Sequence, residues 1–226
     1  MTDFDGNTYT TVIIGTQEWM TENLRTTHYA DGTVIPNLTA DLDWTSDIIG
    51  AYCWYNNNGA NKAIYGGLYN WYAVNNVHGL APRPMDGWRI PTLTDFNIFI
   101  ASVGGNPGAG GELKESGTTH WIAPNTGAVD NYNFTAIPGG ERSDVAFDNL
   151  GNLNGIWTLT SWGIDSAYIC QLTNLSANAS MSVWFQLYGL SVRCVRDHVP
   201  SSSTSTTTTI STSTSTTTPY DYRVKF

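Results

Sequence analysis

A regular alternation of side chains over residues 155–197 constrains the fold more than any other feature of the sequence. In residues 167–172, 180–187 and 190–195, every second side chain is apolar. A period of two over segments this short is typical of half-buried antiparallel strands. Small polar residues at 173–179 separate the first two segments, and Tyr188-Gly189 separates the last two, as hairpins require. The sequence therefore predicts three consecutive antiparallel strands here.

This stretch also carries more aromatic surface than a thin three-stranded sheet can cover. Aromatic rings supply contact area at low entropic cost, and nearby amide groups orient a ligand. We therefore predict seven ligand-binding residues: Trp162, Tyr168, Asn174, Asn178, Trp184, Phe185 and Tyr188. The alternative for each is a place in the core, and we expect about half of them to be buried there.

The rest of the first 198 residues predicts a mixture of short elements. Residues 8–14 alternate as a strand. The clearest helix starts at Thr92 or Thr94, has Asp95 in its first turn, and ends at Gly104-Gly105. We further expect a helix from residue 68 to 74 and a strand from 133 to 137 that runs into a turn. Residues 41–47 and 148–155 are expected to be loops. This pattern predicts an α+β fold with short antiparallel strands, one or two helices and much loop.

Charge and hydropathy exclude two classes of partner. The chain has 226 residues, long enough for one domain with a sizeable core. Ten basic residues against 19 acidic ones give a net charge of -9, and no basic cluster is present, so nucleic-acid binding is not expected. No apolar run approaches the ~20 residues of a membrane span, so membrane insertion is not expected. The first residues also lack the pattern of a signal peptide.

The composition changes after residue 198. Residues 201–218 are all Ser or Thr except Ile210, which predicts a disordered tether. The domain division is therefore a binding domain at 1–198, a flexible linker at 199–218 and a strand-like peptide at 219–226. The alternating peptide suggests docking on a carrier particle or another subunit by strand addition. An ordinary frayed terminus is the equal alternative.

Ordered motifs along the chain resemble the Fibrobacter succinogenes major paralogous domain family. The resemblance covers residues 3–197. The motifs are residues 5–7 (DGN), 14–24 (IGTQEWMTENL), 51–57 (AYCWYNN), 65–74 (YGGLYNWYAV), 87–92 (GWRIPT), 111–115 (GELKE), 134–140 (FTAIPGG) and 189–197 (GLSVRCVRD).

The resemblance implies a C-type-lectin-like fold of the formylglycine-generating-enzyme branch. In such a fold the N- and C-terminal strands pair, and the last strands and their loops display the ligand face. The sequence departs from the family at Leu80-Ala81-Pro82, where many members carry a Cys, and residues 162–188 are the least family-like part. Relatives of this fold are targets of diversity-generating retroelements, and the mixed composition of that segment is compatible with such a variable protein.

No motif points to catalysis. The four His residues are scattered, and the sequence has no HExxH, GxSxG or P-loop pattern. The three Cys residues form no CxxC pair; Cys170 and Cys194 either bridge facing strands or are small buried hydrophobes. We expect no catalytic residue, metal site or cofactor. A structural Ca²⁺ on the oxygen-rich segment 148–154 is the alternative to a plain turn.

These observations predict a non-enzymatic ligand-binding, adhesion or receptor-recognition module. We expect it to be displayed on an extracellular surface or a virion and to bind a cell-surface protein or glycan. The alternative is a structural fibre or decoration subunit whose aromatic face packs against neighbouring copies.

Overall fold

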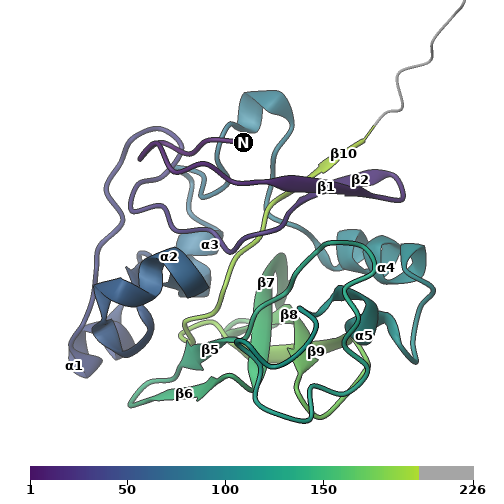
Figure 1. The fold of residues 1–226 in the computed structure, drawn as a ribbon. Helices are drawn as coiled ribbons and strands as arrows, with labels where there is room; N and C mark the ends of the chain where they lie inside the picture. The colour runs from purple at the N-terminus through teal and green to yellow at the C-terminus, as the bar shows by residue number, and fades with distance from the viewer. Residues whose placement is uncertain (199–226) are drawn as a thin grey trace, which may run out of the picture.

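Four small antiparallel sheets and five short α-helices build residues 1–198, the part of the chain that the computed structural model describes (Figure 1). This is an α+β fold, as predicted. The strands are β1 Thr11–Ile14, β2 Gln17–Met20, β3 Tyr52–Cys53, β4 Leu68–Tyr69, β5 Gly139–Arg142, β6 Phe147–Leu150, β7 Leu153–Trp162, β8 Ser166–Thr173, β9 Ser180–Phe185 and β10 Val195–Asp197. The α-helices are α1 Asp41–Ser46, α2 Lys62–Tyr65, α3 Trp71–Val74, α4 Leu93–Ser102 and α5 Ala109–Leu113.

The longest strands form the sheet β7-β8-β9, with β8 in the middle. Neighbouring residues of a strand point to opposite faces, and here both faces of the sheet are covered. Ile169 enters a core that also contains Trp157 and Leu190, while Cys170 enters a second core around Trp19. The predicted strands at 167–172 and 180–187 are confirmed as β8 and β9.

The third predicted strand, at 190–195, is wrong. The third member of the sheet is β7, which pairs with β8 on the side away from β9. Residues 190–194 instead cross the molecule through single backbone bridges, Leu190 with Tyr69 and Ser191 with Ile156. The alternation of this segment does not mark one buried and one exposed face. The apolar side chains enter the core, and Arg193 between them is fully buried as well.

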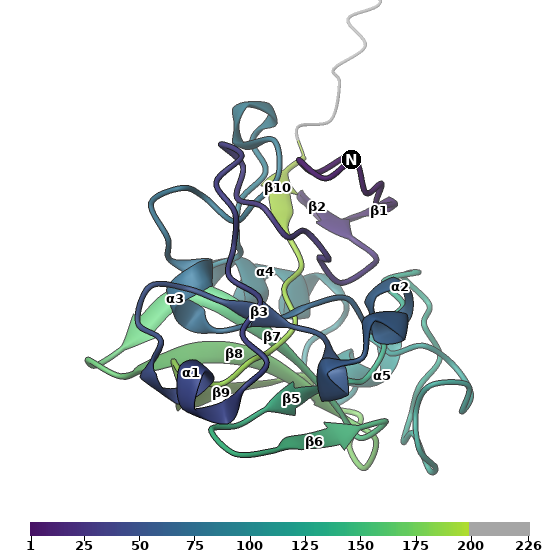
Figure 2. The same ribbon diagram turned by 90° about the vertical axis from the view of Figure 1, so that its left-hand side faces the viewer.

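The two ends of the described chain meet in the sheet β1-β2-β10 (Figure 2). Strand β10 pairs antiparallel with β2, and Val195 lies opposite Trp19. This is the terminal pairing that the family resemblance implied. The predicted strand at 8–14 is confirmed over its second half, as β1, and Gly15 takes a positive φ of 62° in the turn to β2.

Helix α4 is the best-predicted helix. Thr92 caps it, and the side chains of Thr92 and Asp95 each bond the backbone N–H of the other, which makes a capping box. Phe96 and Phe99 pack against Trp19 of β2, with ring centroids 5.0 and 4.4 Å apart. The sequence predicted one or two helices, whereas residues 1–198 contain five α-helices. Only α4 is longer than two turns, since the other four span four to six residues each.

Residues 41–46 are helix α1, so the loop predicted at 41–47 is wrong. Trp44 is the reason: it is fully buried, and its indole nitrogen donates to the backbone oxygen of Leu187 at 2.8 Å. The helix predicted from residue 68 is also wrong at its start. Leu68–Tyr69 pairs with β3, and α3 begins only after Asn70, whose side chain accepts from Ala73 N–H.

Residues 133–150 also differ from the prediction. Asn133 and Thr135 adopt positive φ values of 53° and 50°, so no strand forms at 133–137. Extended structure starts at β5, and β5 pairs with β6 as a hairpin where the sequence predicted turn and loop. Of the loop predicted at 148–155, only the short connection between β6 and β7 lies outside a strand.

Three observations complete the outcome of the sequence predictions. Cys53, Cys170 and Cys194 are all free and buried, and the last two enter different cores, so the Cys170–Cys194 bridge is not formed. Within residues 1–198, no helix has both the length and the hydropathy needed to cross a membrane. The predicted linker at 199–218 and peptide at 219–226 lie outside the described residues.

Candidate ligand-binding groove

The seven predicted site residues do not share one face of the central sheet. In the register of β8 and β9, Tyr168 lies opposite Val183 and Ala167 lies opposite Trp184. Residues that are directly opposite share a face and neighbours along a strand do not. Trp184 therefore points to the face of the Ile169 core, and Tyr168 points to the other.

The rings form two separate groups. Trp162 and Tyr168 pack edge to face, with centroids 5.5 Å apart. Tyr188 contacts both Trp184 and Phe185, with centroid distances of 5.3 and 6.2 Å. Trp162 and Phe185 are each 57% exposed, and the other three rings are half-buried. The expectation that about half of the seven residues would be buried is wrong, because only Asn174 is.

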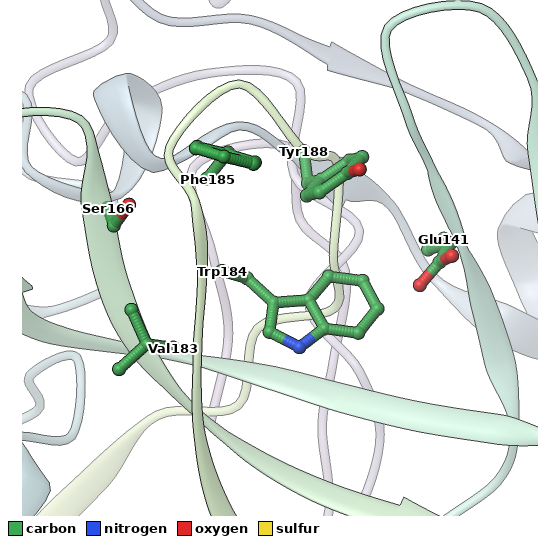
Figure 3. A pocket seen from close by; sticks show the side chains of 6 residues that line it. All are labelled: Glu141, Ser166, Val183, Trp184, Phe185 and Tyr188. Carbon is green, nitrogen blue, oxygen red and sulfur yellow. The ribbon is translucent and has the colours of Figure 1, made fainter.

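Two hollows lie on either side of the Trp184 side chain, and we call them together the Trp184 groove. The first has a volume of about 260 Å³ and is lined by Glu141, Ser166, Val183, Trp184, Phe185 and Tyr188 (Figure 3). The second, of about 390 Å³, is lined by the amide and hydroxyl side chains of Asn149, Asn152, Gln171, Thr173 and Asn174 and by Leu153, Leu175 and Trp184. The groove thus combines aromatic surface with hydrogen-bonding groups, as small-ligand sites do.

The chain fixes the position of Trp184 and Tyr188 through the turn that follows β9. Gln186 is buried; its backbone N–H donates to Asp165 O at 2.8 Å, and its side chain donates to Ser166 O at 3.1 Å. Tyr188 N–H closes the turn on Phe185 O at 3.0 Å. The turn is therefore bonded to the start of β8 and holds both rings at the edge of the sheet.

Strand β5 brings Glu141 to the groove. Arg142 and Gly189 exchange two backbone hydrogen bonds of 2.9 and 2.8 Å, which place β5 beside the Tyr188 turn. Figure 3 shows the Glu141 carboxylate on the same side of β9 as the Trp184 and Tyr188 rings, with Val183 directed away. Burial raises the pKa of Glu141, and the charge of Asp148, opposite it on β6, raises it further.

Sequence reasoning missed Glu141. It follows Gly139-Gly140, so the local pattern predicts a solvated turn, and a single carboxylate after two glycines carries no signal of a site. Its place in the groove depends on the pairing of β5 with Gly189, which is a contact between distant parts of the chain.

The structure brings Trp184, Phe185, Tyr188 and Asn174 together at the groove and leaves the other three residues outside its lining. Asn174 contributes to the second hollow, although its side-chain amide also donates to Ala123 O at 3.4 Å. Trp162 and Tyr168 form a separate exposed pair, and Asn178 lies exposed in the loop before β9.

Side chains that suit catalysis or metal binding are dispersed. His78 pairs with Asp31 at 2.6 Å and His120 with Glu115 at 2.8 Å, while His28 pairs with Asp5. Within residues 1–198, no three His, Cys, Asp or Glu side chains are placed to hold one metal ion.

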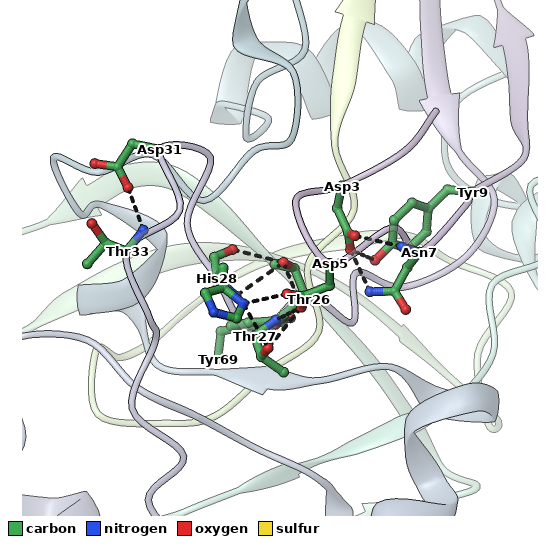
Figure 4. Close-up of polar contacts among 10 residues, drawn as sticks. All are labelled: Asp3, Asp5, Asn7, Tyr9, Thr26, Thr27, His28, Asp31, Thr33 and Tyr69. Carbon is green, nitrogen blue, oxygen red and sulfur yellow. Dashed lines mark hydrogen bonds and ion pairs between the residues drawn. The ribbon is translucent and has the colours of Figure 1, made fainter.

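The carboxylates of the acidic N-terminal loop form hydrogen bonds and an ion pair within the fold (Figure 4). Asp3 accepts from the Tyr9 hydroxyl at 2.6 Å and from the side chain of Asn7 at 2.8 Å. Asp5 accepts from Thr27 and pairs with His28. The Asp3 carboxylate is thus bonded within its own loop, and the Asp5 carboxylate joins this loop to residues 27 and 28.

The oxygen-bearing side chains of the segment 148–154 take part in separate contacts. Asn149 adopts a positive φ of 60° within β6. Asn149 donates to Glu141 at 3.1 Å. Asn154 is fully buried in β7 and donates to Ile137 O at 2.6 Å.

Comparison with known proteins gives one match. Residues 12–196 match the family model described as the Fibrobacter succinogenes major domain. A search of curated proteins and a search of solved structures found no match.

Proposed function

The chain belongs to the Fibrobacter succinogenes major domain family, and we propose that it is a non-enzymatic binding module whose ligand site is the Trp184 groove. The observation that carries the proposal is the half-buried Trp184 ring, which lines two hollows, one mainly aromatic and one with amide, hydroxyl and leucine side chains. Aromatic anchors beside polar groups give affinity and orientation together.

The fold is proposed to be a variant of the C-type-lectin-like fold. Two features support this. The terminal strands pair in β1-β2-β10, and the C-terminal part of the domain forms the sheet β7-β8-β9 with its ligand-facing edge at β9. The module would then be displayed on an extracellular surface or a virion, bind a cell-surface protein or glycan there, and use the C-terminal residues for attachment. Diversification of residues 162–188 by a retroelement belongs to the same proposal.

A structural subunit is the second candidate, and one observation favours it. On the face opposite Trp184, Trp162 of β7 and Val183 and Phe185 of β9 are exposed, together with Ile164 in the hairpin turn. Exposed apolar side chains on one face of a sheet are also suited to contact with another copy of the chain.

Binding to arrays of glycans and cell-surface proteins, measured with the purified full chain, tests the proposal. We expect binding that is lost when Trp184 and Tyr188 are both replaced by Ala. The matched control is Trp162→Ala, which removes an exposed ring outside the groove and is expected to keep binding.

Light scattering over a hundredfold dilution separates the two candidates. A binding module stays monomeric at every concentration. Assembly at high concentration that Trp162→Ala abolishes, together with no binding on the arrays, would favour the structural subunit instead.

A further inference from the structure

One carboxylate oxygen at the Trp184 groove has no hydrogen-bond partner. Glu141 is only 8% exposed. Its Oε1 atom accepts from the Asn149 amide at 3.1 Å, but its Oε2 atom is buried with no partner among the described residues. Burying a charged oxygen without a hydrogen-bond donor costs free energy. A donor supplied by a ligand therefore contributes more binding free energy at this oxygen than at an exposed carboxylate.

The groups around this oxygen are aromatic. Trp184 and Tyr188 line the same hollow as Glu141, and Figure 3 shows the carboxylate on the side of β9 where both rings lie. Aromatic faces attract organic cations, and a carboxylate forms its strongest hydrogen bonds with charged donors. Rings and a carboxylate in one hollow therefore match a cation that also has methylene groups to bury.

Among the described residues, the charged side chains that line this hollow and the adjoining one are all acidic. Glu141 is the only charged residue in its lining, and Asp148 lies opposite it on β6. Asp144 lines an adjoining hollow with Phe185 and Tyr188. The neighbouring Arg142 is fully buried, and its guanidinium is bonded to Leu38 O at 2.6 Å and Asp41 at 3.1 Å. No cation of the lining competes with one from a ligand.

Resting on the proposed function, we propose that the Trp184 groove recognises a basic side chain of a protein ligand. The ammonium or guanidinium hydrogens donate to Glu141 Oε2, and the methylene groups lie against the Trp184 and Tyr188 rings. Because Oε2 is shielded in the unliganded groove, a side chain of the lining must shift for the cation to reach it.

Nuclear magnetic resonance on the ¹⁵N-labelled full chain tests this, with the indole N–H signal of Trp184 assigned through Trp184→Phe. The probes are the methylamides of Nα-acetyl-lysine and Nα-acetyl-arginine, with the Nα-acetyl-norleucine methylamide as the uncharged match. We expect at least one basic probe to shift the signal saturably, with an affinity about tenfold or more above that of norleucine. Equal binding of norleucine, or a response to methyl glucoside and to neither basic probe, would overturn the proposal.

A pair of charge-removing variants tests the role of Glu141. Glu141→Gln keeps the shape and is expected to weaken the basic probe about tenfold, whereas Asp144→Asn removes the same charge from a neighbouring exposed site and is expected to change affinity less than twofold. An equal loss of affinity in both variants would show that the basic probe responds only to the overall negative charge of the region, and would overturn the proposal. If Glu141→Gln does not fold, the comparison of lysine with norleucine on the unaltered protein decides.

The same variants separate this inference from the proposed function. An array ligand that is lost in the Trp184/Tyr188 double variant but retained by Glu141→Gln would leave the binding module standing and overturn recognition of a cation. A basic probe that binds a protein with no array ligand would support the cation site and count against the binding module.

Discussion

Individual residues determine this fold most visibly through three buried cations. Lys114, Arg142 and Arg193 are all fully buried, and each donates to backbone oxygens of segments far apart in sequence. Arg193 donates to Phe134 O and Thr135 O and lies over the Phe134 ring, with 4.4 Å from the guanidinium carbon to the ring centre. Each cation thus fixes backbone that lies mostly outside the strands and helices.

Replacing Lys114 with Met tests this role. The Lys114 ammonium donates to Thr126 O, Thr173 O and Ser176 O at 2.9–3.0 Å, and these oxygens would lose their donor. We expect the free energy of unfolding to fall by about 2–4 kcal/mol, measured by urea denaturation.

The matched control is Lys62→Met, because the Lys62 ammonium lies over the Trp54 ring, 5.4 Å from its centre, and is not fully buried. Its loss is expected to cost less than about 1 kcal/mol. Equal losses in the two variants would show that the buried ammonium does not hold its three segments together.

At the scale of elements, helix α4 depends on Asp95. Burial alone would raise the pKa of this carboxyl, but hydrogen bonds from Thr92 and the Arg89 guanidinium, 2.6 Å away, outweigh it and lower the pKa. A lowered pKa in the folded state stabilises the protein above the unfolded value of about 3.9, and the gain is lost as the pH falls through the folded value.

Asp95→Asn is therefore expected to destabilise the protein by about 1–2 kcal/mol at pH 7 and to lose this effect as the pH falls through the lowered pKa of Asp95. Chemical denaturation at a series of pH values measures the difference. Asp43→Asn, at an exposed acid in the first turn of α1, is the control and should show little change. A difference that is constant across the pH range would contradict the ionic role of Asp95.

Elements with a local signal were predictable, and elements defined by distant contacts were not. The Thr92 cap and the period of two in β8 and β9 are local, so the sequence predicted them correctly. Helix α1 exists because Trp44 is buried against Leu187, and β5 exists because Arg142 pairs with Gly189. Neither contact leaves a pattern in its own segment.

The candidate site was predictable in part for the same reason. The alternation placed Trp184 and Tyr188 on or beside a sheet edge, where their rings line the groove. It did not separate them from Trp162 and Tyr168, because the register between β8 and β9 decides which rings share a face. Glu141 comes from another hairpin and had no signal at all.

Considered as a whole, the molecule is closed by its two ends. Val195 of β10 pairs with Trp19 of β2, exchanges two backbone hydrogen bonds with Arg89, and is fully buried. The terminal strands therefore join segments from the start, middle and end of the described chain. Removing β10 would expose the core around Trp19.

Truncation tests this closure. A chain that ends after His198 is expected to keep the melting temperature of the full chain, because the three hydrophobic cores lie within residues 1–198. A chain that ends after Cys194 loses β10 and is expected not to fold cooperatively. Calorimetry measures both, and a cooperative transition in the shorter chain would contradict the role of β10.

The most direct test of the account is a comparison of two tryptophans in one binding measurement. Calorimetric titration of a ligand found on the arrays would be run with the full chain, Trp184→Ala and Trp162→Ala. If the Trp184 groove is the ligand site, Trp184→Ala weakens binding by at least about 30-fold, as expected of a central aromatic anchor, while Trp162→Ala changes it less than threefold. The reverse order would contradict the account and place the binding site on the opposite face of the sheet.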